Sequence, residues 1–166
     1  MTIQMTGMTL LAYGMAMVSN LLAGPWVVMG GRSASRAVVT EEGLNFEGKL
    51  SLENNGGFGS IRRAVDRVPD EARGVRLRVR GDGRTYQLRL RQDRGFDGVA
   101  WRVEFESTDD WREIQVPFDA FEPVFRVRPV PGAGPFVPPK LGQIGFLIAD
   151  KQPGAFRLQV GELSFY

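Results

Sequence analysis

The chain has 166 residues and a net charge of +2, with 43% hydrophobic and 24% charged residues, which is typical of one globular domain that can bury a core. So small a net charge argues against a nucleic-acid partner. The sequence has no Cys and no His, which excludes disulfides, Ser-His-Asp and Cys-His catalytic groups, and thiolate or imidazole metal sites, so we expect a non-catalytic protein without metal or cofactor.

The first segment, residues 1–25, contains no charged residue. Its apolar run at residues 8–23 is interrupted by Ser19 and Asn20 and is short for a spanning helix, which needs roughly 20 apolar residues. We favour docking of this segment on the domain over contact with a membrane surface. A signal peptide at residues 1–23 ranks third, because the usual positively charged start is missing. We expect a cytoplasmic protein and leave peripheral membrane association open.

From residue 26 onward, apolar and polar residues alternate in short runs that Gly, Asn and Pro separate. The expected strands are residues 37–40, 44–52, 60–65, 74–80, 84–91, 98–106, 111–116, 124–128, 144–149 and 156–166. Hairpins are predicted around the turns at residues 41–43, 53–57, 81–83 and 107–110. Residues 118–121 predict a short turn, and the Pro/Gly-rich residues 129–139 predict a loop. Strands at such regular spacing are typical of a β-sandwich or barrel.

Five sequence motifs occur in a fixed order along the chain. They are VMGGRS at residues 28–33, GKLSLENNGGFGSIRR at 48–63, RGDGRTY at 80–86, VPF at 116–118 and IGFLIADK at 144–151. Together they resemble the complex I intermediate-associated protein family, which comprises the thirty-kilodalton assembly factor of respiratory complex I and its bacterial relatives. One departure is Pro25-Trp26, where family members usually carry Asn-Asp.

The resemblance implies a fold and a role. The implied fold is a galactose-binding-like jelly-roll β-sandwich, an all-β domain that spans residues 26–166. The implied role is the assembly of a membrane enzyme, with a subunit of a respiratory membrane complex as the protein partner. The resemblance supplies no catalytic residues.

A basic surface is predicted from two neighbouring strands. Its residues take alternate positions in the strands on either side of the turn at residues 81–83: Arg76, Arg78, Arg80, Arg89 and Arg91. Alternate residues of a strand share a face, so a hairpin would unite them in one stripe. Arginine forks bind carboxylate and phosphate, which suits an acidic protein, an anionic sugar or a phosphate. Arg126, in a further motif of the family, joins this set.

The alternative for this stripe is a solvated face that Glu104, Glu106 and Asp93 neutralise. A second candidate set points to sugars, since amide and carboxylate groups suit sugar hydroxyls and aromatic rings stack on sugar rings. Its members are Glu53, Asn54, Asn55, Tyr86 and Trp111. Ordinary turn chemistry and core packing are the alternatives for this set. The sequence thus predicts a non-catalytic assembly factor, with a carbohydrate-binding module as the alternative.

Overall fold

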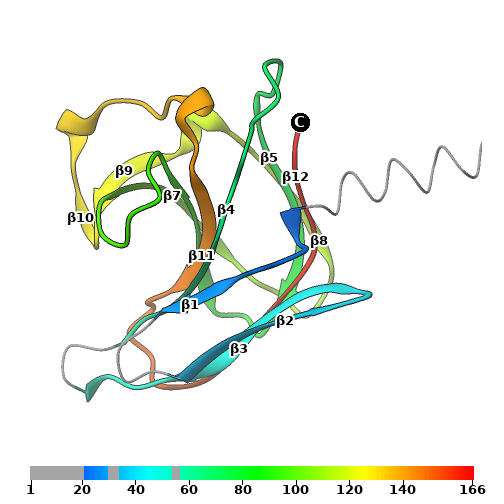
Figure 1. The fold of residues 1–166 in the computed structure, drawn as a ribbon. Helices are drawn as coiled ribbons and strands as arrows, with labels where there is room; N and C mark the ends of the chain where they lie inside the picture. The colour runs from blue at the N-terminus through cyan, green and yellow to red at the C-terminus, as the bar shows by residue number, and fades with distance from the viewer. Residues whose placement is uncertain (1–20, 30–33, 54–56) are drawn as a thin grey trace, which may run out of the picture.

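The alternating runs of sequence build two antiparallel sheets that pack against each other (Figure 1). This computed structural model describes residues 21–29, 34–53 and 57–166. The strands are β1 (Val27–Met29), β2 (Ala34–Thr40), β3 (Gly43–Leu50), β4 (Gly59–Ala64), β5 (Gly74–Gly81), β6 (Thr85–Arg91), β7 (Val99–Glu106), β8 (Arg112–Pro117), β9 (Glu122–Phe125), β10 (Arg128–Pro129), β11 (Gln143–Ile148) and β12 (Gly154–Phe165). Over the described ranges, one sheet has seven strands in the order β1-β4-β11-β6-β7-β9-β10, and the other has five in the order β2-β3-β12-β5-β8. The predicted β-sandwich is confirmed.

The core lies between the two sheets and is built from alternate positions of each strand. In β6, Tyr86, Leu88 and Leu90 are fully buried, because every second side chain of a strand points to the same face. Phe46 of β3 meets Phe156 of β12 with ring centroids 5.0 Å apart. Each fully buried apolar side chain of this size contributes about 1.5–3 kcal/mol to folding.

The described end of the N-terminal segment packs against the sandwich. Leu22 is buried with the core, and its carbonyl accepts a hydrogen bond from Trp26 Nε1 at 2.9 Å. Arg63 Nη1 donates to the carbonyls of Leu21 and Ala23 at 3.0 and 2.5 Å. The alternatives of docking, membrane contact or cleavage for residues 1–20 lie outside the described residues. In the part of the chain that is described, no helix has the length and apolarity to span a membrane.

Apart from β1, which was not predicted, the strands occur close to where the sequence predicts them, but three of the four predicted hairpins are wrong. The hairpin of β2 and β3 is confirmed, with Thr40 opposite Gly43. The pairs β3 and β4, β5 and β6, and β7 and β8 each divide between the two sheets. Alternation specifies which side chains face inward, but it does not specify which sheet a strand joins. The connection of β6 to β7 is instead a hairpin within the seven-stranded sheet.

The short connections follow the predicted turns. A 3₁₀ turn, η3 (Phe118–Ala120), lies in the predicted turn at residues 118–121. The predicted loop at 129–139 contains η4 (Pro131–Ala133), and η5 (Pro138–Lys140) begins at its end. Both of these turns begin with Pro, whose fixed φ suits the first turn position.

The crossing from β5 to β6 is fixed by the carboxylate of Asp82. It accepts hydrogen bonds from the Tyr86 hydroxyl at 3.1 Å and from the backbone N–H of Arg157 at 2.8 Å. It also accepts from the backbone N–H of Arg84 at 3.1 Å. One carboxylate therefore joins the turn between the sheets to β12 of the five-stranded sheet.

Candidate docking site on the seven-stranded sheet

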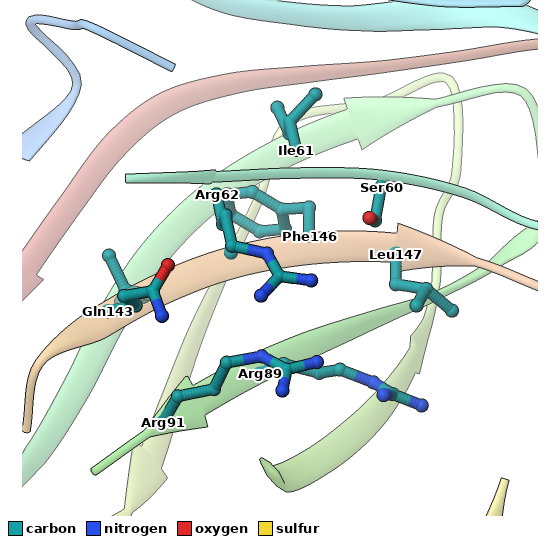
Figure 2. Close-up of a pocket in the computed structure, with 10 residues that line it drawn as sticks. Ser60, Ile61, Arg62, Arg89, Arg91, Gln143, Phe146 and Leu147 are labelled. Carbon is teal, nitrogen blue, oxygen red and sulfur yellow. The ribbon is translucent and has the colours of Figure 1, made fainter. Parts of the chain in front are cut away.

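A row of charged residues crosses the outer face of the seven-stranded sheet. Arg62 of β4 and Arg89 of β6 both lie opposite Gly145 of β11, one on each side. Arg102 of β7 lies opposite Arg89. Directly paired residues of neighbouring strands share a face, and Figure 2 shows the side chains of Arg62, Arg89 and Arg91 on the same side of β11. Gly145, which has no side chain, lies between Arg62 and Arg89, and a Cβ there would meet the carbonyl of Ile61 at 2.4 Å.

Arg89 is buried although it has no carboxylate partner among the described residues. The residue is only 6% exposed. Its Nε donates to Gln87 Oε1 at 2.8 Å, and its Nη2 donates to the carbonyl of Arg126, also at 2.8 Å. Neutral acceptors thus satisfy part of the guanidinium, while its charge is left without a counterion. Buried charges in proteins are usually paired, because burial of an unpaired charge is costly.

Arg62 and Arg91 hold the loop that connects β6 to β7. Arg62 Nη1 donates to the carbonyls of Gly95 and Phe96 at 3.3 and 3.2 Å. Arg91 Nη1 donates to the carbonyl of Gly98 at 3.1 Å. Gln143 Nε2, from β11, also donates to the carbonyl of Gly95, at 3.0 Å. The loop is therefore anchored over one end of the arginine row.

Burial raises the energy of the charged form of these arginines, and neighbouring arginines add to this effect for Arg62 and Arg89. Burial lowers the pKa of Arg89 to about 10, with further lowering by the positive charges of Arg91, Arg102 and Arg62. Burial also lowers the pKa of Arg62 and of Arg91. All of them stay charged at neutral pH, so the face carries positive charge that the protein only partly neutralises.

A small depression lies between these arginines. Its volume is about 20 Å³, and Arg62, Arg89, Arg91 and Gln143 are among its lining residues. About 10–15 Å³ on this measure holds one water molecule, so the depression admits one small polar group and is far too small for a sugar ring. Figure 2 shows the guanidinium groups arranged around it.

Two exposed apolar side chains lie on the loops beside the depression. Phe96, between β6 and β7, is 77% exposed, and Val127, between β9 and β10, is 66% exposed. An ion pair between Arg126 Nη2 and Asp97 Oδ2, 2.9 Å apart, joins the two loops. In Figure 1 the loop between β6 and β7 lies beside β9 and β10. We call Phe96, Val127, Arg62, Arg89 and Arg91 the docking face.

The predicted single basic stripe is wrong, because its arginines lie on opposite sheets. Arg76, Arg78 and Arg80 belong to β5 of the five-stranded sheet, whereas Arg89 and Arg91 belong to β6 of the seven-stranded sheet. The strands were expected to pair as a hairpin, but the turn at residues 81–83 crosses from one sheet to the other. The predicted basic set therefore divides: Arg76, Arg78 and Arg80 lie on β5, while Arg89 and Arg91 lie on β6, where Arg89 donates to the backbone carbonyl of Arg126.

The arginines of β5 are engaged on the outer face of their own sheet. The guanidinium carbons of Arg78 and Arg80 lie 4.1 and 4.6 Å from the ring centroid of Trp111. Arg76 pairs with Glu113 at 3.5 Å. Trp111 is half-buried, and these two cations cover its ring. This is the stacking that cations and indole rings favour.

The predicted sugar set does not form a platform. Tyr86 has no exposed surface, because its position in β6 faces the core. Glu53 is exposed, and Asn54 and Asn55 lie outside the described residues. With Tyr86 buried and Trp111 covered by arginines, neither predicted ring is free to stack on a sugar.

Sequence reasoning missed several residues of the docking face. Arg62 follows the buried Ile61 in β4. Because successive side chains of a strand point to opposite faces, the sequence could have indicated that Arg62 faces outward. Phe96 is a lone aromatic residue in the polar sequence QDRGFDG, where no core position is expected. For Val127 the sequence holds no comparable signal, since a valine after Phe125 and Arg126 fits a continuing strand.

Comparisons with known proteins place this chain in a family. The sequence pattern of the family described as Complex I intermediate-associated protein 30 matches residues 25–160. The mouse (Mus musculus) protein "Complex I intermediate-associated protein 30, mitochondrial" is 36% identical over 91 residues. That alignment covers 51% of this chain and only 27% of the mouse protein.

Solved structures agree with the fold. A family 11 carbohydrate-binding module of a Clostridium thermocellum cellulase has a TM-score of 0.66 at 15% identity, covering 89% of this chain and 91% of its own. A structure of a family 11 module from C. thermocellum in complex with a mixed-linked tetrasaccharide has a TM-score of 0.65 at 16% identity, covering 87% of this chain and 91% of its own. These likenesses confirm a β-sandwich of the galactose-binding-like type. By its match over residues 25–160, the chain belongs to the Complex I intermediate-associated protein 30 family.

Proposed function

We propose that this chain is a non-catalytic assembly factor that docks transiently on a protein subunit of respiratory complex I. The observation that carries the proposal is the family match over residues 25–160. A cytoplasmic location, with peripheral contact at the membrane that holds the partner, goes with this role. Because the chain has no His or Cys, binding is a simpler role for it than nucleophilic or metal-assisted catalysis.

The docking face is the surface that we assign to the partner. Protein interfaces are enriched in aromatic residues and arginine, and a few such residues carry most of the binding energy. Phe96 and Val127 offer apolar surface at two adjacent loop tips, and the arginines beside them offer charge. The loops are held in place by Arg62, Arg91 and the Arg126–Asp97 pair, so little ordering is needed on binding.

The proposal is tested by affinity purification of the tagged full chain from its own host, with chemical cross-linking and mass spectrometry. We expect subunits of complex I to be enriched with the wild-type chain and reduced several-fold with the F96S and V127S variants. The matched control is V38S, which changes an exposed valine of β2 in the other sheet. Enrichment of no complex I subunit would contradict the assembly role, and equal enrichment with F96S and V127S would contradict this surface.

A further inference from the structure

We propose that the depression between Arg62, Arg89 and Arg91 receives the carboxylate of an acidic side chain of the protein partner. This inference rests on the proposed docking function and names the partner chemistry that the docking face would recognise. It starts from hydrogen-bond donors that the fold leaves unused. Among the described residues, Arg89 Nη1 and the Nε and Nη2 atoms of Arg62 and Arg91 donate to no acceptor.

Structural support of the loop does not explain why these residues are charged. Arg62 and Arg91 each use one nitrogen to hold loop carbonyls. Gln143 holds the same carbonyl of Gly95 with a neutral amide, so the task does not require a cation. The charges are costly where they are, since burial and mutual repulsion lower the pKa of Arg62 and Arg89. A costly charge that the fold does not need is a mark of a binding site.

The nearby carboxylates neutralise the depression only in part: against the larger lowering by burial, Asp93 and Asp97 raise the pKa of Arg62 and Arg91. Arg102, at the end of the row, pairs with Glu122 at 3.1 Å and Glu104 at 3.8 Å. Asp97 pairs with Arg126, and Asp93 accepts from the backbone N–H of Gly95 at 2.9 Å. Within the described residues, Arg62, Arg89 and Arg91 have no carboxylate within ion-pair distance. A carboxylate from outside would supply the missing counterion.

The size and surroundings of the depression favour a side chain over a larger anion. A volume of about 20 Å³ accepts the end of a carboxylate, which a guanidinium fork can bind through two oxygens. The exposed Phe96 and Val127 beside it provide apolar contact around a buried ion pair, as in the centre of a protein interface. An acidic side chain that enters between two apolar contacts is therefore the occupant that fits.

The test is anion-dependent stability of the full chain. Thermal unfolding is measured in sodium acetate, sodium phosphate and sodium chloride at equal ionic strength and pH, because a ligand that binds only the native state raises the Tm. We expect acetate to raise the Tm above its value in chloride and to shift the Nε–H NMR signals of Arg62 and Arg91. In R62Q and R91Q, acetate binding should weaken about tenfold or more.

Matched variants separate a site effect from a general salt effect. R78Q removes an arginine from the outer face of the other sheet and should keep the full acetate effect. R62K keeps the positive charge but lacks the guanidinium group that can bind both oxygens of a carboxylate. It should therefore keep only part of the rise in Tm that acetate causes. Equal Tm values in acetate and chloride for the wild type, or an unchanged acetate effect in R62Q and R91Q, would overturn the proposal. A stronger effect of phosphate than of acetate, lost in the same variants, would also overturn it and indicate a phosphate ligand.

The same variants distinguish this inference from the proposed function. If complex I subunits co-purify with the wild type and with R62Q and R91Q equally, the carboxylate site is wrong and the assembly role stands. If acetate binds at these arginines but no complex I subunit co-purifies with the wild type, the assembly role is wrong and the carboxylate site stands. Loss of both acetate binding and subunit recovery in R62Q and R91Q, but not in R78Q, supports the inference.

Discussion

Arg84 and Asp150 form a two-point ion pair that joins two distant segments of the chain. Arg84 Nη2 lies 2.6 Å from Asp150 Oδ1, and Arg84 Nε lies 2.8 Å from Asp150 Oδ2. The side chains are only 11% and 9% exposed. Arg84 also donates to the carbonyl of Ala155 at 2.8 Å. Two of the motifs that resemble the family, at residues 80–86 and 144–151, therefore meet in a structural contact away from the docking face.

We predict that R84Q and D150N each lower the free energy of unfolding by about 3 kcal/mol, because each leaves one buried charge without its partner. Urea denaturation of the variants measures this change. The control is R67Q, since Arg67 and Asp70 are 4.0 Å apart and largely exposed and such pairs contribute roughly 0–1 kcal/mol. Equal effects of R84Q and R67Q would show that the buried pair contributes little.

The pair also predicts a pH dependence. The hydrogen bonds from Arg84 lower the pKa of Asp150 below its ordinary value of 3.8. Asp150 therefore stabilises the fold above that value, and the contribution is lost as the pH falls through the lower folded pKa. Unfolding free energies measured from pH 6 down to the acid transition should fall less steeply for D150N than for the wild type. Parallel curves for the two proteins would contradict the prediction.

Y86F tests the assignment of Tyr86 to the core. The variant removes the hydroxyl that donates to Asp82 at 3.1 Å. We expect a loss of about 1.5–3 kcal/mol in unfolding free energy, because the lost hydrogen bond is to a charged acceptor. Recovery of the partner in affinity purification should not change. Reduced recovery by a stably folded Y86F would place Tyr86 in the binding surface instead.

The division of the arginines between two sheets is tested by double-mutant cycles. Unfolding free energies of R78Q and R91Q should add within about 0.5 kcal/mol, since the two residues share no partner. R62Q and R91Q should couple, because the charge of Arg91 lowers the pKa of Arg62. The first substitution already removes the repulsion between Arg62 and Arg91, so the second substitution gains no further stability from its removal. Strong coupling of Arg78 with Arg91 would indicate that they share a face after all.

The stacking of Arg78 and Arg80 on Trp111 predicts a fluorescence change. R78A uncovers part of the indole, so we expect a red shift of tryptophan emission and a loss of about 0.5–1 kcal/mol. R76A is the control, because Arg76 contacts Glu113 and lies 5.6 Å from the Tyr166 ring centroid. An identical spectrum for R78A and the wild type would mean that the guanidinium does not shield Trp111.

The alternation of side chains was sufficient to predict where most strands lie and which of their apolar residues are buried. Leu88 and Leu90 are in the core as their spacing predicts. The same pattern could not assign strands to sheets, because strands of both sheets show the same alternation of apolar and polar residues. The turn at residues 81–83 has the composition of a hairpin turn, but Asp82 instead anchors a crossing between the sheets. The crossing depends on the hydrogen bond that Asp82 accepts from the backbone N–H of Arg157, which is 75 residues away from it in the sequence.

The candidate site was predictable only in part. Arg89 and Arg91 were recognised as a basic pair because they alternate with apolar residues. Their neighbour Arg62 comes from a strand far away in sequence, and the order β4-β11-β6 that unites them is a property of the fold. Burial of Arg89 was equally beyond the sequence, since it depends on Gln87 and on the turn at Arg126.

Site-specific photo-cross-linking tests the docking role most directly. A photoreactive amino acid replaces Phe96 in the full chain in its own host, and a matched protein carries it at exposed Val38 on the other sheet. Mass spectrometry then identifies the adducts. We predict adducts with complex I subunits from position 96 and not from position 38. Absence of these subunits at position 96, or equal adducts at both positions, would contradict docking through this face.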